Sequence, residues 1–244
     1  MTNSYVAIDI ETTGLEPKTD KITEIAAVKV VDGRVAERYV TLVNPKRPLG
    51  EKIVELTGIT DHMVAQAPGI EAVIGPFVAF CGELPLLGHN ILFDYSFLQR
   101  AAVNHGLEFE REGIDTLNLC RAFMPPANKK NLASACAFYR VEQVQAHRAE
   151  ADAVSAHLLY QRMLAGHGGE RQELFVPKPL IYRAKREQPA TKRQKEYLQD
   201  LIKCHRIDVT VQIESLSRNE ASRMIDQILS QYGRKAKIKE VIIQ

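Results

Sequence analysis

No stretch of the 244-residue sequence approaches the roughly 18 consecutive apolar residues of a membrane-spanning helix, so no transmembrane segment is expected. The first residues also lack the basic stretch, apolar core and small-residue cleavage site of a signal peptide. The four cysteines form no Cys-x-x-Cys pair, and we expect them to be reduced and mostly buried. Together these absences predict a cytoplasmic protein without a membrane partner.

Charge is nearly balanced over the whole chain, with a formal net charge of +2, but it is not balanced along the chain. Residues 1–170 contain 16 Lys and Arg against 21 Asp and Glu, whereas residues 171–244 contain 16 against 9. A basic tail on an acidic body favours contact between the tail and a polyanion. A solvated basic surface explains the same charge equally well.

Hydrophobic periodicity predicts an α/β domain that opens with three antiparallel strands. They are predicted at 5–10, 22–31 and 35–43, with Asp32-Gly33 as the turn between the last two. Short buried strands are predicted near 84–88 and at Ile114. The predicted helices are 71–81, 91–105, 116–123, 131–138 and 148–165. Three strands followed by alternating helices and strands predict a mixed sheet flanked by helices.

The pattern changes near residue 168. Residues 166–190 contain three glycines and three prolines, and their aliphatic residues keep no period, so we predict a linker over 169–190. Thr191 is a predicted N-cap for a helix at 192–205. Ser217 and Glu220 form a capping box before a second helix. The predicted organisation is therefore a domain at 1–168, the linker, and a small basic helical module at 191–244.

Two carboxylates stand at the end of the first predicted strand. Asp9 and Glu11 are two residues apart, so their side chains share one face of the strand. Burial of either acid without a partner is costly, and a divalent cation such as Mg²⁺ or Mn²⁺ removes the conflict. Thr12-Thr13-Gly14 follows, with hydroxyls and backbone amides that suit a phosphate-bearing ligand. The alternative is a strand that ends in two solvated acids.

Two further segments place polar side chains on predicted helices. Asp94 lies in the first turns of helix 91–105 among apolar neighbours, as a metal ligand or as an acid that interacts with the helix dipole. His147 precedes helix 148–165, and Asp152 follows five residues later, so both can face one cavity. A neutral imidazole can accept a proton from water. Asp94 alone is equally compatible with an ordinary acid near a helix start. His147 and Asp152 alone fit a surface histidine and a solvated acid better, because their spacing is short and common.

Together the three segments resemble the three motifs of the DEDDh 3′–5′ exonuclease family. The matching stretches are Asp9-x-Glu11-Thr12-Thr13-Gly14, Gly88-His89-Asn90-x-x-Phe93-Asp94-x-x-Phe97-Leu98 and His147-Arg148-Ala149-x-x-Asp152. Residues 56–68 also resemble a segment of the proofreading epsilon subunit of bacterial DNA polymerase III and of the exonuclease domain of Gram-positive replicative polymerases. The resemblance covers residues 5–165 and keeps all four acids and the histidine.

The resemblance implies a ribonuclease H-like fold with a mixed five-stranded sheet, and a nuclease that releases nucleoside 5′-monophosphates. It implies that two divalent metal ions, Mg²⁺ or Mn²⁺, are held by Asp9, Glu11, Asp94 and Asp152, with His147 as the general base. It implies substrate contacts at Thr12, Thr13, Gly14, Leu15, Asn90 and Phe97. For Phe97 a place in the core is an open alternative, because Phe93 precedes it by four residues on the same helix.

The expected substrate is the 3′ end of single-stranded nucleic acid, with DNA favoured over RNA, in proofreading or repair. Predicted phosphate contacts are Arg183, Lys185, Arg186, Lys192, Arg193 and Lys195. The C-terminal module is alternatively a docking site for a polymerase or repair partner. Two other functions remain: an exoribonuclease of the ribonuclease T or oligoribonuclease type, and a non-catalytic nucleic-acid-binding subunit.

Overall fold

The computed structural model describes residues 2–143, 147–208 and 212–233. The chain divides into two compact units, Met1–Lys185 and Arg186–Gln244. The first unit is built on a six-stranded sheet with the strand order β3-β2-β1-β4-β5-β6. No helix in these described ranges has both the length and the hydropathy of a membrane span.

The sheet is mixed, as predicted. β1 (Tyr5–Thr12), β2 (Ile22–Val31) and β3 (Arg34–Leu42) are antiparallel, and Asp32 and Gly33 both have positive φ, as a tight hairpin turn requires. β4 (Leu86–Gly88) and β5 (Glu112–Asp115) run parallel to β1. The sheet has six strands rather than five, because the two-residue β6 (Lys178–Pro179) pairs with β5. A strand that short leaves no periodic signal in the sequence.

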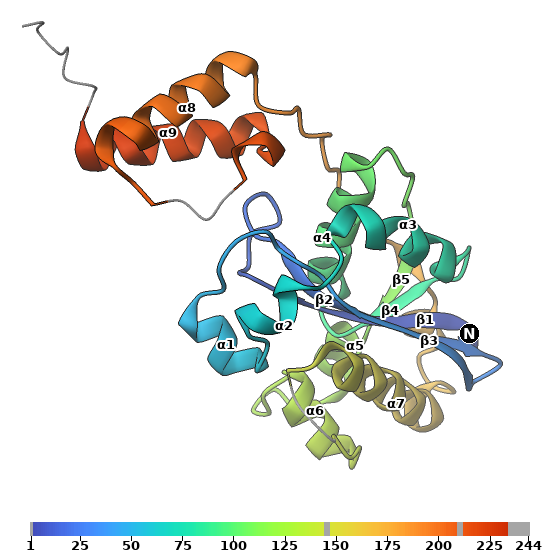
Figure 1. Cartoon of the computed structure of the whole chain (residues 1–244). Helices are drawn as coiled ribbons and strands as arrows, with labels where there is room; N and C mark the ends of the chain where they lie inside the picture. The colour runs from blue at the N-terminus through green and yellow to red at the C-terminus, as the bar shows by residue number, and fades with distance from the viewer. Residues whose placement is uncertain (1, 144–146, 209–211, 234–244) are drawn as a thin grey trace, which may run out of the picture. The chain divides into compact units, whose positions relative to one another are not determined.

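Helices cover both faces of the sheet (Figure 1). One face carries α3 (Ile70–Cys81) and α4 (Ile91–Asn104), and the other carries α5 (Thr116–Phe123), α6 (Leu132–Tyr139) and α7 (Ala149–His167). All five helices begin and end within two residues of the predicted positions. The sequence did not predict the short helices α1 (Glu51–Thr57) and α2 (Asp61–Ala65). These helices enclose a small separate core of Leu49, Ile59 and Val64.

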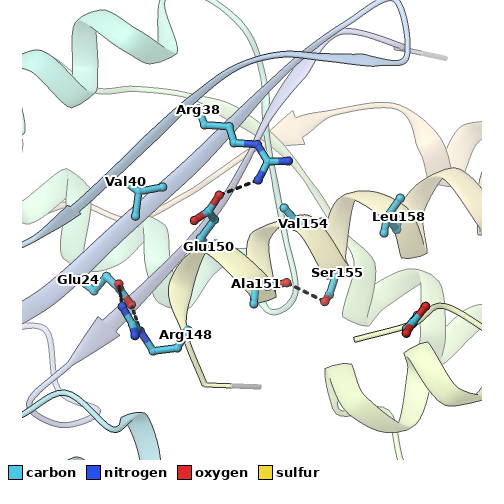
Figure 2. A pocket seen from close by; sticks show the side chains of 10 residues that line it. Glu24, Arg38, Val40, Arg148, Glu150, Ala151, Val154, Ser155 and Leu158 are labelled. Carbon is cyan, nitrogen blue, oxygen red and sulfur yellow. Dashed lines mark hydrogen bonds and ion pairs between the residues drawn. The ribbon is translucent and has the colours of Figure 1, made fainter. Parts of the chain in front are cut away.

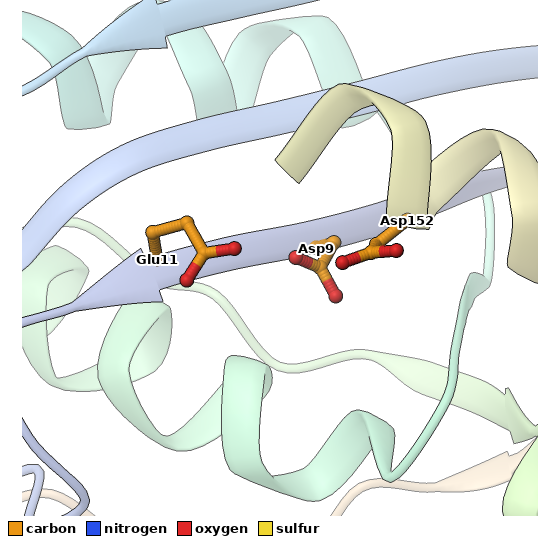
Figure 3. Close-up of side chains that lie close together, drawn as sticks. All are labelled: Asp9, Glu11 and Asp152. Carbon is orange, nitrogen blue, oxygen red and sulfur yellow. The ribbon is translucent and has the colours of Figure 1, made fainter. Parts of the chain in front are cut away.

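Alternate residues of β1 pack into opposite layers of the core. Tyr5 and Ala7 pack on the side of α7, whereas Val6 and Ile8 pack on the side of α3 and α4. The same alternation directs the last odd-numbered residues of the strand toward α7. The fold therefore delivers Asp9 and Glu11 to the place where β1 leaves the apolar core, beside the start of α7 (Figure 3).

Residues 169–185, predicted as part of a linker, pack on the first unit instead. Phe175 is fully buried in the short helix η1 (Gln172–Phe175). Leu180 lies against Gly113, where a β-carbon would come within 2.8 Å of the leucine. Ala184 N donates a hydrogen bond to Gln99 Oε1 at 3.1 Å. These anchor points are irregularly spaced, so the first unit extends to Lys185 although the segment shows no periodicity.

The second unit contains the two predicted helices, α8 (Lys192–His205) and α9 (Arg218–Tyr232), with the short helix η2 (Ile213–Ser215) between them. Both helices begin at complete capping boxes, Thr191 with Gln194 and Ser217 with Glu220. Their shared core includes Leu198, Leu201, Ala221, Ile225 and Ile228. The apolar faces of the two helices are thus turned toward each other.

Candidate active site

Three carboxylates meet where β1 ends beside α7 (Figure 3). One oxygen from each of Asp9, Glu11 and Asp152 lies within 4.8 Å of the others. Asp152, in the first turn of α7, is buried, and the two β1 acids are half-buried. Carboxylate oxygens in such a cluster are the ligands that Mg²⁺ and Mn²⁺ prefer.

Asp94 reaches the same place from α4, on the other side of the sheet. It is only 4% exposed, and its Oδ1 accepts a hydrogen bond from Ile10 N at 3.0 Å, which holds the carboxylate against the backbone between the two β1 acids. The structure thus brings all four predicted acids together from β1, α4 and α7, with Asp94 just outside the tight group of three.

Burial raises the pKa of these acids, and mutual repulsion adds to the rise at Asp9, Glu11 and Asp94. Burial raises the pKa of Asp9 well above its ordinary value, and the charges of Asp94 and Asp152 raise it further. Burial raises the pKa of Glu11 to about 7, and Asp152 adds to the effect. Burial also raises the pKa of Asp94 to about 8. A divalent cation would supply the opposite charge and so favour the ionised form of these carboxylates. The donor set therefore fits such an ion.

Asp152 is held in place by the segment before α7. Its Oδ2 accepts a hydrogen bond from His147 N at 2.9 Å, and its Oδ1 accepts one from Gln143 Nε2 at 2.8 Å. Burial raises the pKa of Asp152, and these two hydrogen bonds oppose the rise. Gln143 was not identified from the sequence, since no motif marks a residue in this connection.

His147 itself has a φ of 61°, in the left-handed region, and its side chain is exposed. The structure therefore places the imidazole at solvent, two residues before α7 begins at Ala149. This position is open to a substrate and to water.

The hydroxyl groups of Thr12 and Thr13, which were predicted to contact substrate, form hydrogen bonds within the loop after β1. Thr12 Oγ1 donates a hydrogen bond to Gly14 O at 2.6 Å, and Thr13 Oγ1 accepts one from Lys21 N at 3.0 Å. Both hydroxyls therefore close the loop on itself. Their role in the structure is to shape the turn that follows the acids.

The same loop presents Leu15 to solvent. A β-carbon at Gly14 would lie 2.5 Å from Asp20 Oδ2, and that carboxylate accepts a hydrogen bond from Glu16 N at 2.9 Å. The absence of a side chain at Gly14 thus lets Asp20 tie the loop together. Leu15 is 83% exposed as a result, an unusual position for a large apolar side chain.

The two predicted contacts on α4 differ in their surroundings. Asn90, the N-cap residue, has a φ of 68°, donates its backbone N–H to Asp115 Oδ1 at 2.9 Å and has an exposed side chain. Phe97 is 3% exposed and packs against Phe93, with ring centroids 5.1 Å apart. Phe97 therefore belongs to the core rather than to an open pocket, because residues four apart share one helical face.

The predicted phosphate contacts divide between the two units. Arg183 and Lys185 belong to the first, and Arg186, Lys192, Arg193 and Lys195 belong to the second. Lys195 forms an ion pair with Glu214 at 2.6 Å, and Lys192 approaches Glu196 at 3.8 Å. Neighbouring acids thus offset part of the basic charge of the second unit.

Glu24 on β2 is a buried acid that the sequence did not reveal, because it stands inside an apolar strand. It lies opposite Glu11 in the β1–β2 register and is only 2% exposed. It forms an ion pair with Arg148 at 2.7 Å, beside the acid cluster. Both residues also line a hollow of about 480 Å³ between β3 and α7 (Figure 2).

Known proteins are similar to this chain in sequence or in fold. The PolC-type DNA polymerase III of Halalkalibacterium halodurans is 40% identical over 161 residues, which cover 65% of this chain and 11% of that protein. A structure of exonuclease X in complex with 5′-overhanging duplex DNA matches with a TM-score of 0.52 at 28% identity, over 67% of this chain and 92% of that chain. E. coli exonuclease I in complex with a dT13 oligonucleotide matches with a TM-score of 0.60 at 19% identity, over 71% of this chain and 43% of that chain, which shows a common fold.

The chain spans about a tenth of the length of the polymerase relative, 11%. The family described as Exonuclease, RNase_T, matches residues 6–160, a range that contains all four acids and His147. The resemblance to exonucleases that the three motifs predicted is thereby confirmed, and the chain belongs to this exonuclease family.

Proposed function

We propose that this chain is a metal-dependent 3′–5′ exonuclease that releases nucleoside 5′-monophosphates from single-stranded DNA ends. The observation that carries the proposal is the convergence of Asp9, Glu11 and Asp152, with Asp94 beside them, in a member of an exonuclease family. DNA is favoured because one relative is a DNA polymerase and two similar structures contain DNA. The proposed setting is proofreading or repair.

The four acids would hold two divalent ions, Mg²⁺ or Mn²⁺, as oxygen ligands. Bound ions would supply positive charge and Lewis-acid activation for hydrolysis of a phosphodiester. In this proposal the exposed imidazole of His147 accepts a proton from the attacking water. Leu15 packs against the terminal base, and Asn90 contacts the same nucleotide. Thr12, Thr13 and Gly14 form the loop that holds Leu15 in place.

The sharpest test uses 5′-labelled single-stranded DNA and RNA of matched sequence, with Mg²⁺, with EDTA, and with Asp9→Ala as a control. We expect DNA to shorten stepwise from its 3′ end with Mg²⁺ only, and near-complete loss of activity in Asp9→Ala and Asp94→Ala. His147→Ala should lower kcat about 10²–10⁴-fold, as expected for a missing general base. Faster shortening of RNA would favour the exoribonuclease, and binding without cleavage would favour the non-catalytic subunit.

We also propose that exposed basic residues of each unit bind the DNA backbone. The support is the positive balance of residues 171–244 and the exposure of Arg183, Lys185, Arg186 and Arg193. Changing these four residues to glutamine in the full chain should weaken DNA binding. Each lost contact should flatten the dependence of log K on log salt by about 0.7 for a single strand. An unchanged slope would leave docking of a polymerase or repair partner as the role of the module.

A further inference from the structure

We infer that Glu24 and Arg148 form a positioning pair that sets the geometry of the acid cluster and thereby its affinity for divalent cations. The inference rests on the proposed function, since it assigns these residues a role toward the same metal site. Neither side chain is among the four acids or the histidine of that site. Their part is to fix the position of groups that bind the metal.

The pair ties the start of α7 to β2. The Glu24 carboxylate accepts hydrogen bonds from Arg148 Nη2 at 2.7 Å and from Arg148 Nε at 3.2 Å (Figure 2). It also accepts one from Ala149 N at 3.0 Å. Two parallel bonds from one guanidinium fix both distance and orientation, which a single ammonium group does not do. The carboxylate is 2% exposed and the arginine side chain 31%, so water competes little for these bonds.

Both ends of this link adjoin acids of the cluster. Glu24 lies directly opposite Glu11 in the pairing of β1 with β2. Arg148 is the N-cap residue of α7 and contributes no side-chain cap of its own, and its carbonyl accepts the backbone hydrogen bond of Asp152 N at 3.0 Å. The link therefore sets the separation between Glu11 on the sheet and Asp152 on the helix.

The positive charge of Arg148 also offsets the negative charge of Glu24 beside the acid cluster. Without the arginine, the buried Glu24 would add an uncompensated negative charge next to the four acids of the cluster. The guanidinium offsets that charge, so the cluster keeps the four acids available for external cations. Removing only one partner of a buried pair leaves an uncompensated charge and perturbs its surroundings.

A second ion pair in the same hollow supplies a matched control. Arg38 Nη1 lies 2.6 Å from Glu150 Oε1, also between the sheet and the first turn of α7 (Figure 2). Its side chains are 51% and 42% exposed. Exposed pairs of this kind contribute little, and within the described residues this one is not hydrogen-bonded to an acid of the cluster.

The test compares Mn²⁺ affinity, by titration calorimetry, in four full-chain variants: Arg148→Met, Arg148→Lys, Glu24→Gln and Arg38→Met. Circular dichroism with thermal unfolding identifies folded variants. We expect both Arg148 variants to bind Mn²⁺ about 10–100-fold more weakly, the range for residues that orient metal ligands, and Glu24→Gln to be weakened in the same direction. Arg38→Met should stay within about twofold of the unmodified chain. Should Arg148→Met fail to fold, Arg148→Lys and Glu24→Gln carry the same comparison.

A kinetic readout separates positioning from general damage. The Mn²⁺ concentration for half-maximal DNA cleavage should rise with the measured Kd, while kcat at saturating Mn²⁺ changes less. Folded Arg148 and Glu24 variants with unaltered Mn²⁺ affinity would overturn the inference alone. An unmodified chain that binds no Mn²⁺ or leaves DNA intact would instead overturn the proposed function.

Discussion

Replacing Glu11 with glutamine should stabilise the metal-free protein at pH 8. Burial and the charge of Asp152 raise the pKa of Glu11 from 4.5 to about 7 in the folded chain. A carboxyl group with a higher pKa in the folded state opposes folding once both states are ionised, above pH 7. This penalty declines as the pH falls from the folded value toward the unfolded one. The substitution removes the penalty and retains the shape of the side chain.

The size of the effect follows from the same two values. A pKa of about 7 against 4.5 corresponds to about 3 kcal/mol at pH 8. Glu11 is only half-buried, so solvent screening reduces the expected gain in the free energy of unfolding to about 1–2 kcal/mol. At pH 5 the carboxyl of the folded protein is already protonated, and the gain should fall below about 0.5 kcal/mol.

Urea unfolding in EDTA at both pH values measures this difference. Glu37→Gln is the control, because its carboxylate is 61% exposed and pairs with Lys29 at 3.4 Å. The control should change the free energy of unfolding by less than about 0.5 kcal/mol at either pH. A loss of stability in Glu11→Gln at pH 8, or an equal gain at pH 5 and pH 8, would refute the reasoning that repulsion strains this cluster.

Three further outcomes are expected. Leu15→Ser should leave the free energy of unfolding within about 0.5 kcal/mol, because the side chain is exposed, while KM for single-stranded DNA rises; steady-state kinetics with an unaltered KM would speak against contact with the substrate. Leu180→Ala should lower the free energy of unfolding by about 1–2 kcal/mol and expose the 169–185 segment to limited proteolysis, since Leu180 packs on Gly113; unchanged cleavage would mean that the segment is not anchored there. Mn²⁺ affinity should rise between pH 6 and pH 8, because Glu11 with a pKa of about 7 and Asp94 with a pKa of about 8 must release protons to bind the ion; calorimetry that shows no pH dependence would contradict those values.

Local signals predicted most of the elements. The Asp32-Gly33 turn, the Thr191 cap and the Ser217–Glu220 box each act through the backbone of their own few residues, so they can be identified without knowing the fold. Helices with a long apolar face were also predicted, because their periodicity can be read from their own residues. The short helices α1 and α2 depend instead on a satellite core around Ile59, which no local pattern reveals.

The acids of the site were predicted from the sequence, whereas the residues that hold them in place were not. Asp9 and Glu11 interrupt an apolar strand at its end, and the combination with Asp94, His147 and Asp152 is recognisable along the chain. The partners that hold these residues come from other elements and become visible only in three dimensions. Glu24 is identified by the pairing of β1 with β2 and by Arg148, and Gln143 by its bond to Asp152.

For Phe97 and for the 169–185 segment, only tertiary packing distinguishes between the possible interpretations of the sequence. An aromatic residue four positions after Phe93 fits a pocket or a core, and only the 3% exposure of Phe97 identifies the core. Glycine and proline after residue 166 suit a linker, yet Phe175 and Leu180 anchor the segment to the first unit.

The proposed activity requires that four carboxylates from β1, α4 and α7 hold divalent cations. Anomalous diffraction from a crystal soaked in Mn²⁺ tests it most directly. We expect manganese peaks among Asp9, Glu11, Asp94 and Asp152, and their loss in Asp9→Asn crystals. Diffraction with fully occupied manganese elsewhere, and none among these four side chains, would contradict the account.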